Sequence, residues 1–128
     1  MLGAGGLWLN HDNGGAEVVG EASHPGWRTI RYQGVRVDIP ASWERLDTND
    51  CEFQFEVWAP SDSASCEWSR GMAFYGSATF DAAHKPGVRR TRSSDEPGWS
   101  GHTYAGDFAL YVSDGDRQTV VRVLRSAR

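Results

Sequence analysis

Three polar side chains in the last third of the sequence, Ser100, His102 and Asp107, are of the types that form a nucleophilic triad. In such a triad a histidine takes the proton of the serine hydroxyl, and an acid orients the histidine. Ser100 and His102 are two residues apart and would share one face of a strand. However, the Gly-Trp-Ser-Gly sequence at Ser100 is one residue short of the G-x-S-x-G elbow. We therefore interpret the trio as the polar face of an edge strand and expect no enzymatic activity.

Paired carboxylates and clustered histidines are the other common catalytic and metal-binding arrangements. Glu52 and Glu56 are four apart in a strand-like segment, which separates them by about 13 Å, more than an inverting glycosidase pair. The four histidines are His11, His24, His84 and His102, and their spacings do not match those of metal ligands. We expect no metal site and no cofactor.

Aromatic residues give the clearest indication of binding. Trp58, Tyr75 and Tyr111 alternate with the apolar residues of their own expected strands, so they would share the opposite face. If these strands are neighbours, the three rings form a partly exposed patch; if the helix covers that face, the rings belong to the core. An exposed patch bordered by Glu52 and Glu56 would suit an amphipathic, cationic ligand through stacking and carboxylate pairing.

Charge is distributed unevenly along the chain. The net charge of −4 argues against nucleic-acid binding, which needs a basic surface. Residues 44–67 carry seven acids and one base, whereas residues 85–92 carry four bases and no acid. One interpretation is that the two runs are solvated loops of opposite charge. The other is that residues 44–67 form a region that attracts cations.

The only two cysteines, Cys51 and Cys66, close a short polar segment. In the cytosol such a pair would most often be free thiols, and no further ligands stand near them to complete a metal site. In an exported protein we expect a Cys51–Cys66 disulfide, which would contribute about 3 kcal/mol.

Hydrophobic periodicity predicts mainly antiparallel strands. Residues 27–32 and 35–39 would form a hairpin turning at Gln33-Gly34, and residues 99–113 a second hairpin turning at 105–107. Two further strands are expected, and their core-facing residues are Phe53, Phe55 and Val57 in residues 51–58, and Met72, Phe74 and Phe80 in residues 71–80.

The last segment changes to helical period. Ser113 is the expected N-cap, and the apolar stripe consists of Val120, Val121, Leu124 and Ala127. The predicted fold class is α+β: an antiparallel β-sheet with a C-terminal amphipathic helix packed on it, and one disulfide.

The N-terminal segment predicts an attachment to the membrane. Met1–Leu9 is apolar and uncharged, and a polar, glycine-rich stretch follows. Leu2-Gly3-Ala4 matches the end of a lipoprotein signal, but Gly5 stands where the lipidated cysteine would follow. Three explanations are open: the cysteine has been removed, the segment is the tail of a transmembrane helix, or the likeness is accidental. We expect residues 1–25 to be a flexible anchor remnant and tether, and residues 26–128 a single extracytoplasmic domain.

From Trp27 onward, over about three-quarters of its length, the chain resembles secreted or lipid-anchored actinobacterial proteins, mostly of unknown function. The similarity rests on residues 32–43, Cys51, residues 104–109 and the ending from Arg117 through residues 124–128. The strand-Pro-x-x-Trp opening also resembles PsbP-like domains, which are α+β sandwiches. Within the actinobacterial group the chain is similar to self-resistance lipoproteins of lantibiotic producers, which protect the cell from its own lipid II-binding peptide.

These resemblances imply a binding protein at the outer face of the cell membrane. The expected partner is an amphipathic peptide (a lantibiotic) or lipid II, and the membrane itself is reached through an N-terminal lipid or helix anchor. The alternative is a regulatory or structural ectodomain that binds another cell-envelope protein.

Overall fold

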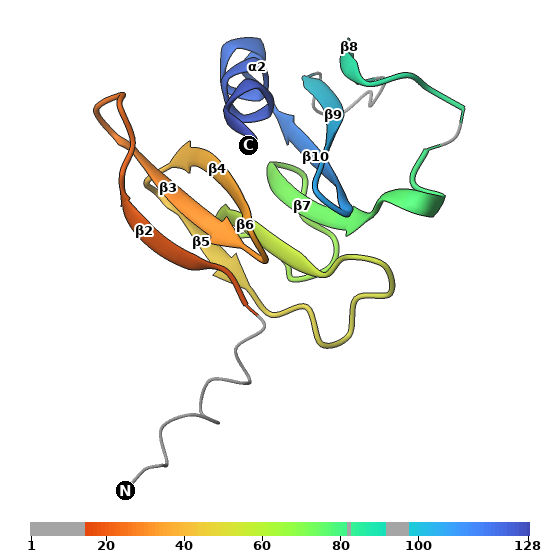
Figure 1. The fold of residues 1–128 in the computed structure, drawn as a ribbon, viewed down its shortest axis with the longest axis horizontal. Helices are drawn as coiled ribbons and strands as arrows, with labels where there is room; N and C mark the ends of the chain where they lie inside the picture. The colour runs from red at the N-terminus through yellow and green to blue at the C-terminus, as the bar shows by residue number, and fades with distance from the viewer. Residues whose placement is uncertain (1–14, 82, 92–97) are drawn as a thin grey trace, which may run out of the picture.

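The computed structural model describes residues 15–81, 83–91 and 98–128. The expected anchor and the first part of the expected tether lie outside these residues. Two antiparallel sheets pack against each other and against one helix (Figure 1). The predicted fold class is therefore confirmed.

The strands are divided between a small and a large sheet. The small sheet has the order β2 (Glu17–Glu21), β3 (Trp27–Tyr32) and β4 (Val35–Pro40). The large sheet has the order β5 (Trp43–Leu46), β6 (Glu56–Pro60), β7 (Gly71–Gly76), β10 (Phe108–Asp114), β9 (Trp99–Ala105) and β8 (Gly87–Arg90). A 3-10 turn, η2 (Ser77–Thr79), follows β7, and the helix α2 (Arg117–Ser126) follows β10.

Both predicted hairpins are present. β3 and β4 pair from Trp27–Pro40 to Tyr32–Val35, which leaves a two-residue loop. Gln33 and Gly34 have φ angles of 47° and 88°, the left-handed conformation that a type I′ hairpin turn requires at both positions. β9 and β10 are also joined by a two-residue loop, Gly106-Asp107, in which Gly106 alone has a positive φ angle, of 58°.

Strand β2 differs from the predicted domain boundary. Residues 17–21 were assigned to the tether, but they pair with β3, with a bulge between Val18 and Gly20. All five residues of β2 are exposed. An edge strand that buries no side chain has no hydrophobic alternation, so the usual strand pattern was absent here.

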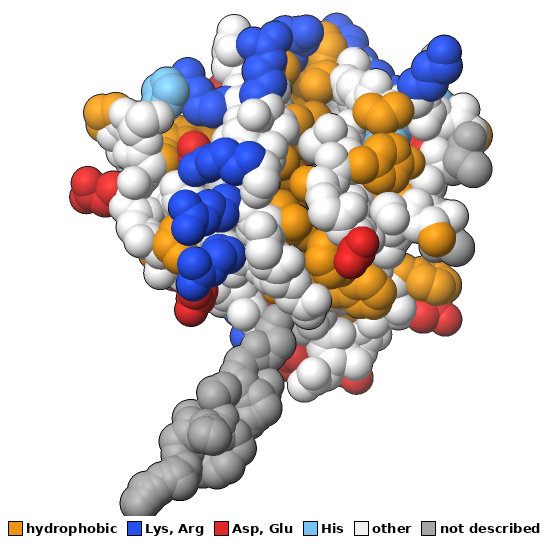
Figure 2. All heavy atoms as spheres, in the orientation of Figure 1, with side chains coloured by type: hydrophobic (Ala, Val, Ile, Leu, Met, Phe, Trp, Pro, Cys, Tyr) orange, Lys and Arg blue, Asp and Glu red, His pale blue; other side chains and the backbone are white. Residues whose placement is uncertain are grey.

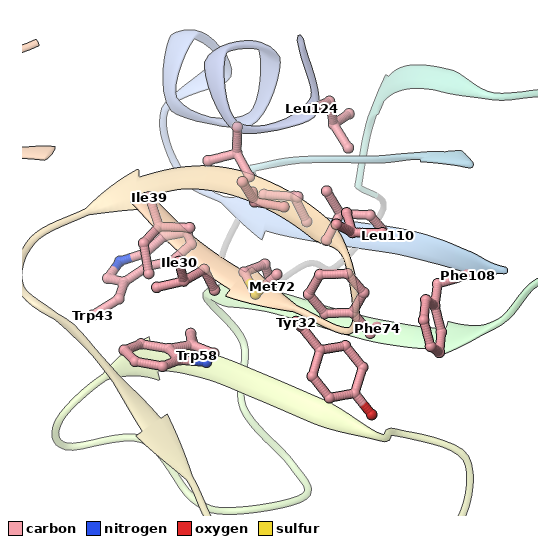
Figure 3. Packing of buried hydrophobic residues seen from close by; sticks show 14 of the residues in the cluster. Ile30, Tyr32, Ile39, Trp43, Trp58, Met72, Phe74, Phe108, Leu110 and Leu124 are labelled. Atoms are coloured by element: carbon pink, nitrogen blue, oxygen red, sulfur yellow. The ribbon is translucent and has the colours of Figure 1, made fainter. Parts of the chain in front are cut away.

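The core lies between the two sheets and is closed at one end by the helix. Ile30, Val37 and Ile39 of the small sheet are fully buried. They belong to one cluster with four residues of the large sheet, Met72, Phe74, Leu110 and Val112. Figure 3 shows Ile30, Ile39, Met72 and Phe74 gathered in the space between the sheets.

Helix α2 begins later than predicted and buries a slightly different stripe. Its N-cap is Asp116, whose side chain accepts a hydrogen bond from the Gln118 backbone, while Ser113 belongs to β10. The buried residues are Val120, Val123 and Leu124, so the predicted Val121 is replaced by Val123. The helix packs against β4, β9 and β10. Among the described residues, no helix has the length and hydrophobicity needed to cross a bilayer.

The faces of β6 are inverted relative to the prediction. Glu56 and Trp58 pair with Phe74 and Met72 and point into the core, whereas Val57 points to the opposite side. Phe53 and Phe55, predicted to be core residues, precede the strand and are 65% and 49% exposed. Alternation tells which residues share a face, but it does not tell which face is the core.

Candidate functional site

The side of the large sheet that faces away from the core carries a cluster of aromatic rings. Tyr75 on β7 and Tyr111 on β10 lie on neighbouring strands, with ring centroids 6.4 Å apart. Since Met72, Phe74, Leu110 and Val112 alternate with them and point into the core, the two tyrosines point outward. The helix packs on the opposite side of the sheet, so the alternative in which it covers Tyr75 and Tyr111 is wrong.

Further rings extend this cluster in an unbroken series. Phe80 lies 4.9 Å from Tyr75 and 4.9 Å from His102, and Trp68 lies 6.0 Å from Tyr111. We refer to the whole set as the aromatic face: Trp68, Tyr75, Phe80, His102, Tyr104 and Tyr111. Phe80 was predicted to lie in the core, but the η2 turn follows β7 and places its ring beside Tyr75 instead.

Two residues of the predicted site lie elsewhere. Trp58 is 5% exposed and Glu56 is 1% exposed, and both lie on the core side of β6. One carboxylate oxygen of Glu56 accepts hydrogen bonds from Arg45 Nε at 2.9 Å and from Trp58 Nε1 at 2.7 Å. Trp58 and Glu56 are therefore internal structural residues: the buried carboxylate is paired with the half-exposed Arg45 and hydrogen-bonded to the indole. Glu52 is exposed on the loop that precedes β6.

Two adjacent hollows open on the aromatic face and share Tyr75. The first, the aromatic cavity, has a volume of about 340 Å³ and is lined by Phe53, Phe55, Tyr75, Gly76, Phe80 and Asp81. The second, the polar cavity, has a volume of about 220 Å³ and is lined by Gln54, Cys66, Trp68, Ser69, Tyr75, Tyr111 and Ser113. An amphipathic ligand could place apolar groups in one and polar groups in the other.

The disulfide loop, residues 51–66, forms one wall of both hollows. The predicted bond joins Cys51 to Cys66, with the Cα atoms 5.4 Å apart. Between the two cysteines, Gln54 accepts a hydrogen bond from Trp68 Nε1 at 2.8 Å and donates one to the Cys66 carbonyl at 3.5 Å. The disulfide thus positions Phe53, Gln54 and Phe55 against the aromatic face.

His102 is the most buried titratable group of the aromatic face. It is 1% exposed, and its Nε2 has no hydrogen-bond partner within the part of the chain that the structure describes. Burial lowers the pKa of His102; the Asp81 carboxylate acts in the opposite direction, while Arg89 and His84 lower the pKa further. Burial also raises the pKa of Tyr75, and a hydrogen bond from His84 lowers the pKa of Asp81 at the cavity edge.

The lowered pKa of His102 predicts that the folded protein loses stability in mild acid. The unfolded chain binds the histidine proton more tightly, so the free energy of unfolding should fall as the pH drops through about 6.5 toward the lower folded-state pKa. We expect His102→Asn to flatten this part of the profile when urea unfolding is measured between pH 8 and pH 5. The matched control is His24→Asn, because His24 is exposed between β2 and β3. An unchanged slope in His102→Asn would contradict this assignment.

The arrangement offers few groups for catalysis. Ser100 and His102 share one face of β9, but Asp107 lies in the turn at the far end of the hairpin. Within the described ranges, no three side chains among His, Cys, Asp and Glu are placed to hold a metal ion. What the geometry provides is a set of stacking surfaces and two hollows.

Sequence reasoning found Tyr75 and Tyr111 but missed most of the aromatic face. Trp68, Phe80 and His102 come from a loop, a turn and a different strand, so no single periodic pattern links them. The one available signal is the density of rings between residues 53 and 80.

Comparisons with known proteins give no relative to set beside this site. No protein-family model, curated protein or solved structure matches the chain.

Proposed function

We propose that the aromatic face binds an amphipathic, cationic peptide outside the cell membrane, and that the protein acts in self-resistance to a lantibiotic by sequestering it. The observation that supports this proposal best is the aromatic cavity, where two exposed phenylalanines stand beside Tyr75 and Phe80. Membrane attachment and the extracytoplasmic location belong to the same proposal and rest on the sequence resemblance.

The exposed phenylalanines favour a binding role over a purely structural one. Phe53 and Phe55 are among the few large hydrophobic side chains that the described residues expose, and they lie together at one cavity. A contiguous apolar patch on a small protein commonly marks a site that a partner covers. Covering it would contribute about 25 cal/mol for each Å² of apolar surface removed from water.

The charges around the aromatic face suit a cationic ligand. The disulfide loop carries Glu52 on its exposed surface, and Asp81 stands at the edge of the aromatic cavity. Further exposed carboxylates lie in the same part of the sequence, at Glu44, Asp47, Asp50, Asp62 and Glu67. Arg89 and His84 lie near His102 at the β8 end of the aromatic face, whereas Figure 2 shows a column of Lys and Arg side chains over α2 and the small sheet. A peptide carrying lysines beside apolar residues matches this combination.

The test is an amide NMR titration of the oxidised, isotope-labelled protein with a lipid II-binding lantibiotic, and separately with lipid II. We expect shifts at Phe53–Phe55, Tyr75 and Tyr111 with the lantibiotic alone. The variant Phe53→Ser should weaken binding by roughly tenfold, because exposed aromatic anchors carry most of the energy of such contacts.

Val18→Ser is the matched control, since Val18 is 47% exposed on β2 and takes no part in the aromatic face. Equal weakening by both substitutions would mean nonspecific hydrophobic binding. Shifts with lipid II alone would replace sequestration by shielding of the target. No shifts with either ligand would rule out direct binding and favour a cell-envelope protein as the partner.

A further inference from the structure

A third hollow, which we call the basic groove, lies between α2 and the edge strand β8, on the helix side of the large sheet. The helix packs over β9 and β10, and β8 lies beyond β9 at the edge of the sheet (Figure 1). The space beside the helix is an open groove of about 430 Å³. Its lining includes the apolar residues Val88, Val121 and Leu124 and the arginines Arg117 and Arg125.

Two arginines line the groove, Arg117 and Arg125, although the chain as a whole is acidic. Arg117 of the helix and Arg90 of β8 each lie 5.5 Å from the ring centroid of Trp99, which brings two guanidinium groups to one indole. Arg89 does not belong to the groove, because it pairs with Ser100 and points to the opposite side of the sheet from Val88.

The two carboxylates at the start of the helix, Asp114 and Asp116, accept hydrogen bonds from neighbouring groups of the same segment. Asp116 accepts hydrogen bonds from the Gln118 backbone and the Thr119 hydroxyl, and Asp114 accepts one from the Asp116 backbone. Among the described residues, no ion pair engages Arg90, Arg117 or Arg125. Gathering several guanidinium groups in one place is unfavourable unless an anion or solvent compensates, so an anionic ligand would relieve it.

The order of side chains along the helix indicates what kind of anion fits. Arg117, Val121, Leu124 and Arg125 are spaced by four, three and one residues, so they follow one side of the helix over about 12 Å. The two apolar residues lie between the arginines and face Val88 across the groove. The site therefore combines an apolar floor with charged ends.

We infer that the basic groove binds a phosphate-bearing amphiphile, such as the anionic lipids of a membrane. The guanidinium groups match phosphate oxygens in a bidentate manner, which lysine does not do, and the hydrocarbon part covers Val88, Val121 and Leu124. This inference does not depend on the peptide site, because the basic groove shares no lining residue with the aromatic cavity or the polar cavity; of the aromatic face it touches only His102.

The experiment titrates the oxidised full chain with dihexanoyl phosphatidic acid below its micelle concentration. Dihexanoyl phosphatidylcholine, inorganic phosphate and a glutamate-rich decapeptide are the comparison probes. We expect amide shifts at Val88, Val121 and Leu124 with the phosphatidic acid, and much weaker ones with the choline lipid or free phosphate. The double variant Arg117→Gln/Arg125→Gln should weaken binding about tenfold or more, since it removes charge-assisted hydrogen bonds.

Arg122→Gln is the control on the same helix. Arg122 stacks over Trp27 at 5.3 Å on the side of the small sheet, so its substitution should leave the affinity within about twofold. Three results would overturn the inference: equal affinity for both lipids, equal weakening by the control variant, or binding of the acidic decapeptide in place of the lipid. Shifts on the aromatic face report on the peptide proposal separately.

Discussion

Replacing Phe74 by alanine is expected to lower the free energy of unfolding by about 3–5 kcal/mol. Phe74 is fully buried at the centre of β7, and its ring centroid lies 4.9 Å from that of Tyr32 and 5.7 Å from that of Phe108. The contact with Tyr32 joins the large sheet to the small one, and the contact with Phe108 lies within the large sheet, so truncation leaves a cavity between the two sheets. Urea unfolding followed by tryptophan fluorescence measures the change.

Phe53→Ala is the matched control for this prediction. Both residues are phenylalanines, but Phe53 is 65% exposed and its removal should change the stability by less than about 1 kcal/mol. Because a domain of this size has a total stability of only about 5–15 kcal/mol, Phe74→Ala could lose its cooperative transition altogether. Similar losses in the two variants would contradict the assignment of Phe74 to the core and Phe53 to the surface.

Removing the disulfide is expected to affect both stability and binding. The variant Cys51→Ser/Cys66→Ser loses a cross-link over a sequence separation of 15 residues, which corresponds to about 3 kcal/mol. It should also abolish peptide binding, because Phe53, Gln54 and Phe55 lie between the two cysteines and form a wall of both hollows. Calorimetric unfolding and the lantibiotic titration measure the two effects.

The two effects can be separated with a variant that is destabilised elsewhere. Ile39→Val removes one methylene from the core and should cost about 0.5–1.5 kcal/mol while peptide affinity stays unchanged. If the disulfide variant is folded at low temperature and still binds the peptide with full affinity, the loop does not shape the site.

The parts of the fold that local sequence specifies were predicted well. The β3–β4 hairpin depends on a two-residue turn in which Gln33 and Gly34 both have positive φ angles. Gly34 between two strand-like runs is the signal in the sequence that predicts this turn. The C-terminal helix shows its period in residues 117–126, although its cap was placed three residues too early because Ser113 and Asp116 are both good caps.

The candidate site was predicted only in part. Whether a strand face is buried or exposed depends on what packs against it, and the sequence of the strand does not show this. Trp58 shares a face with Glu56, and the alternation left open whether that face is an exposed patch or is covered and belongs to the core. In the structure Arg45 and the Trp58 indole compensate the Glu56 carboxylate, so a charged side chain lies in the core. The Arg45 part of that compensation comes from the neighbouring strand β5, and the hydrophobic alternation within residues 51–58 does not reveal it.

The contact between the end of α2 and strand β4 has a consequence for the order of folding. The Ser126 hydroxyl meets the Asp38 backbone across 88 residues, and the backbones of Arg36 and Arg128 exchange two hydrogen bonds. Contacts of such long sequence separation slow folding, because the chain loses entropy before they form. The β3–β4 hairpin is local and can form early, whereas Val120, Val123 and Leu124 can complete the core only after the rest of the chain has been made. The core beside β4 is therefore completed last, when residues 117–126 pack against that strand.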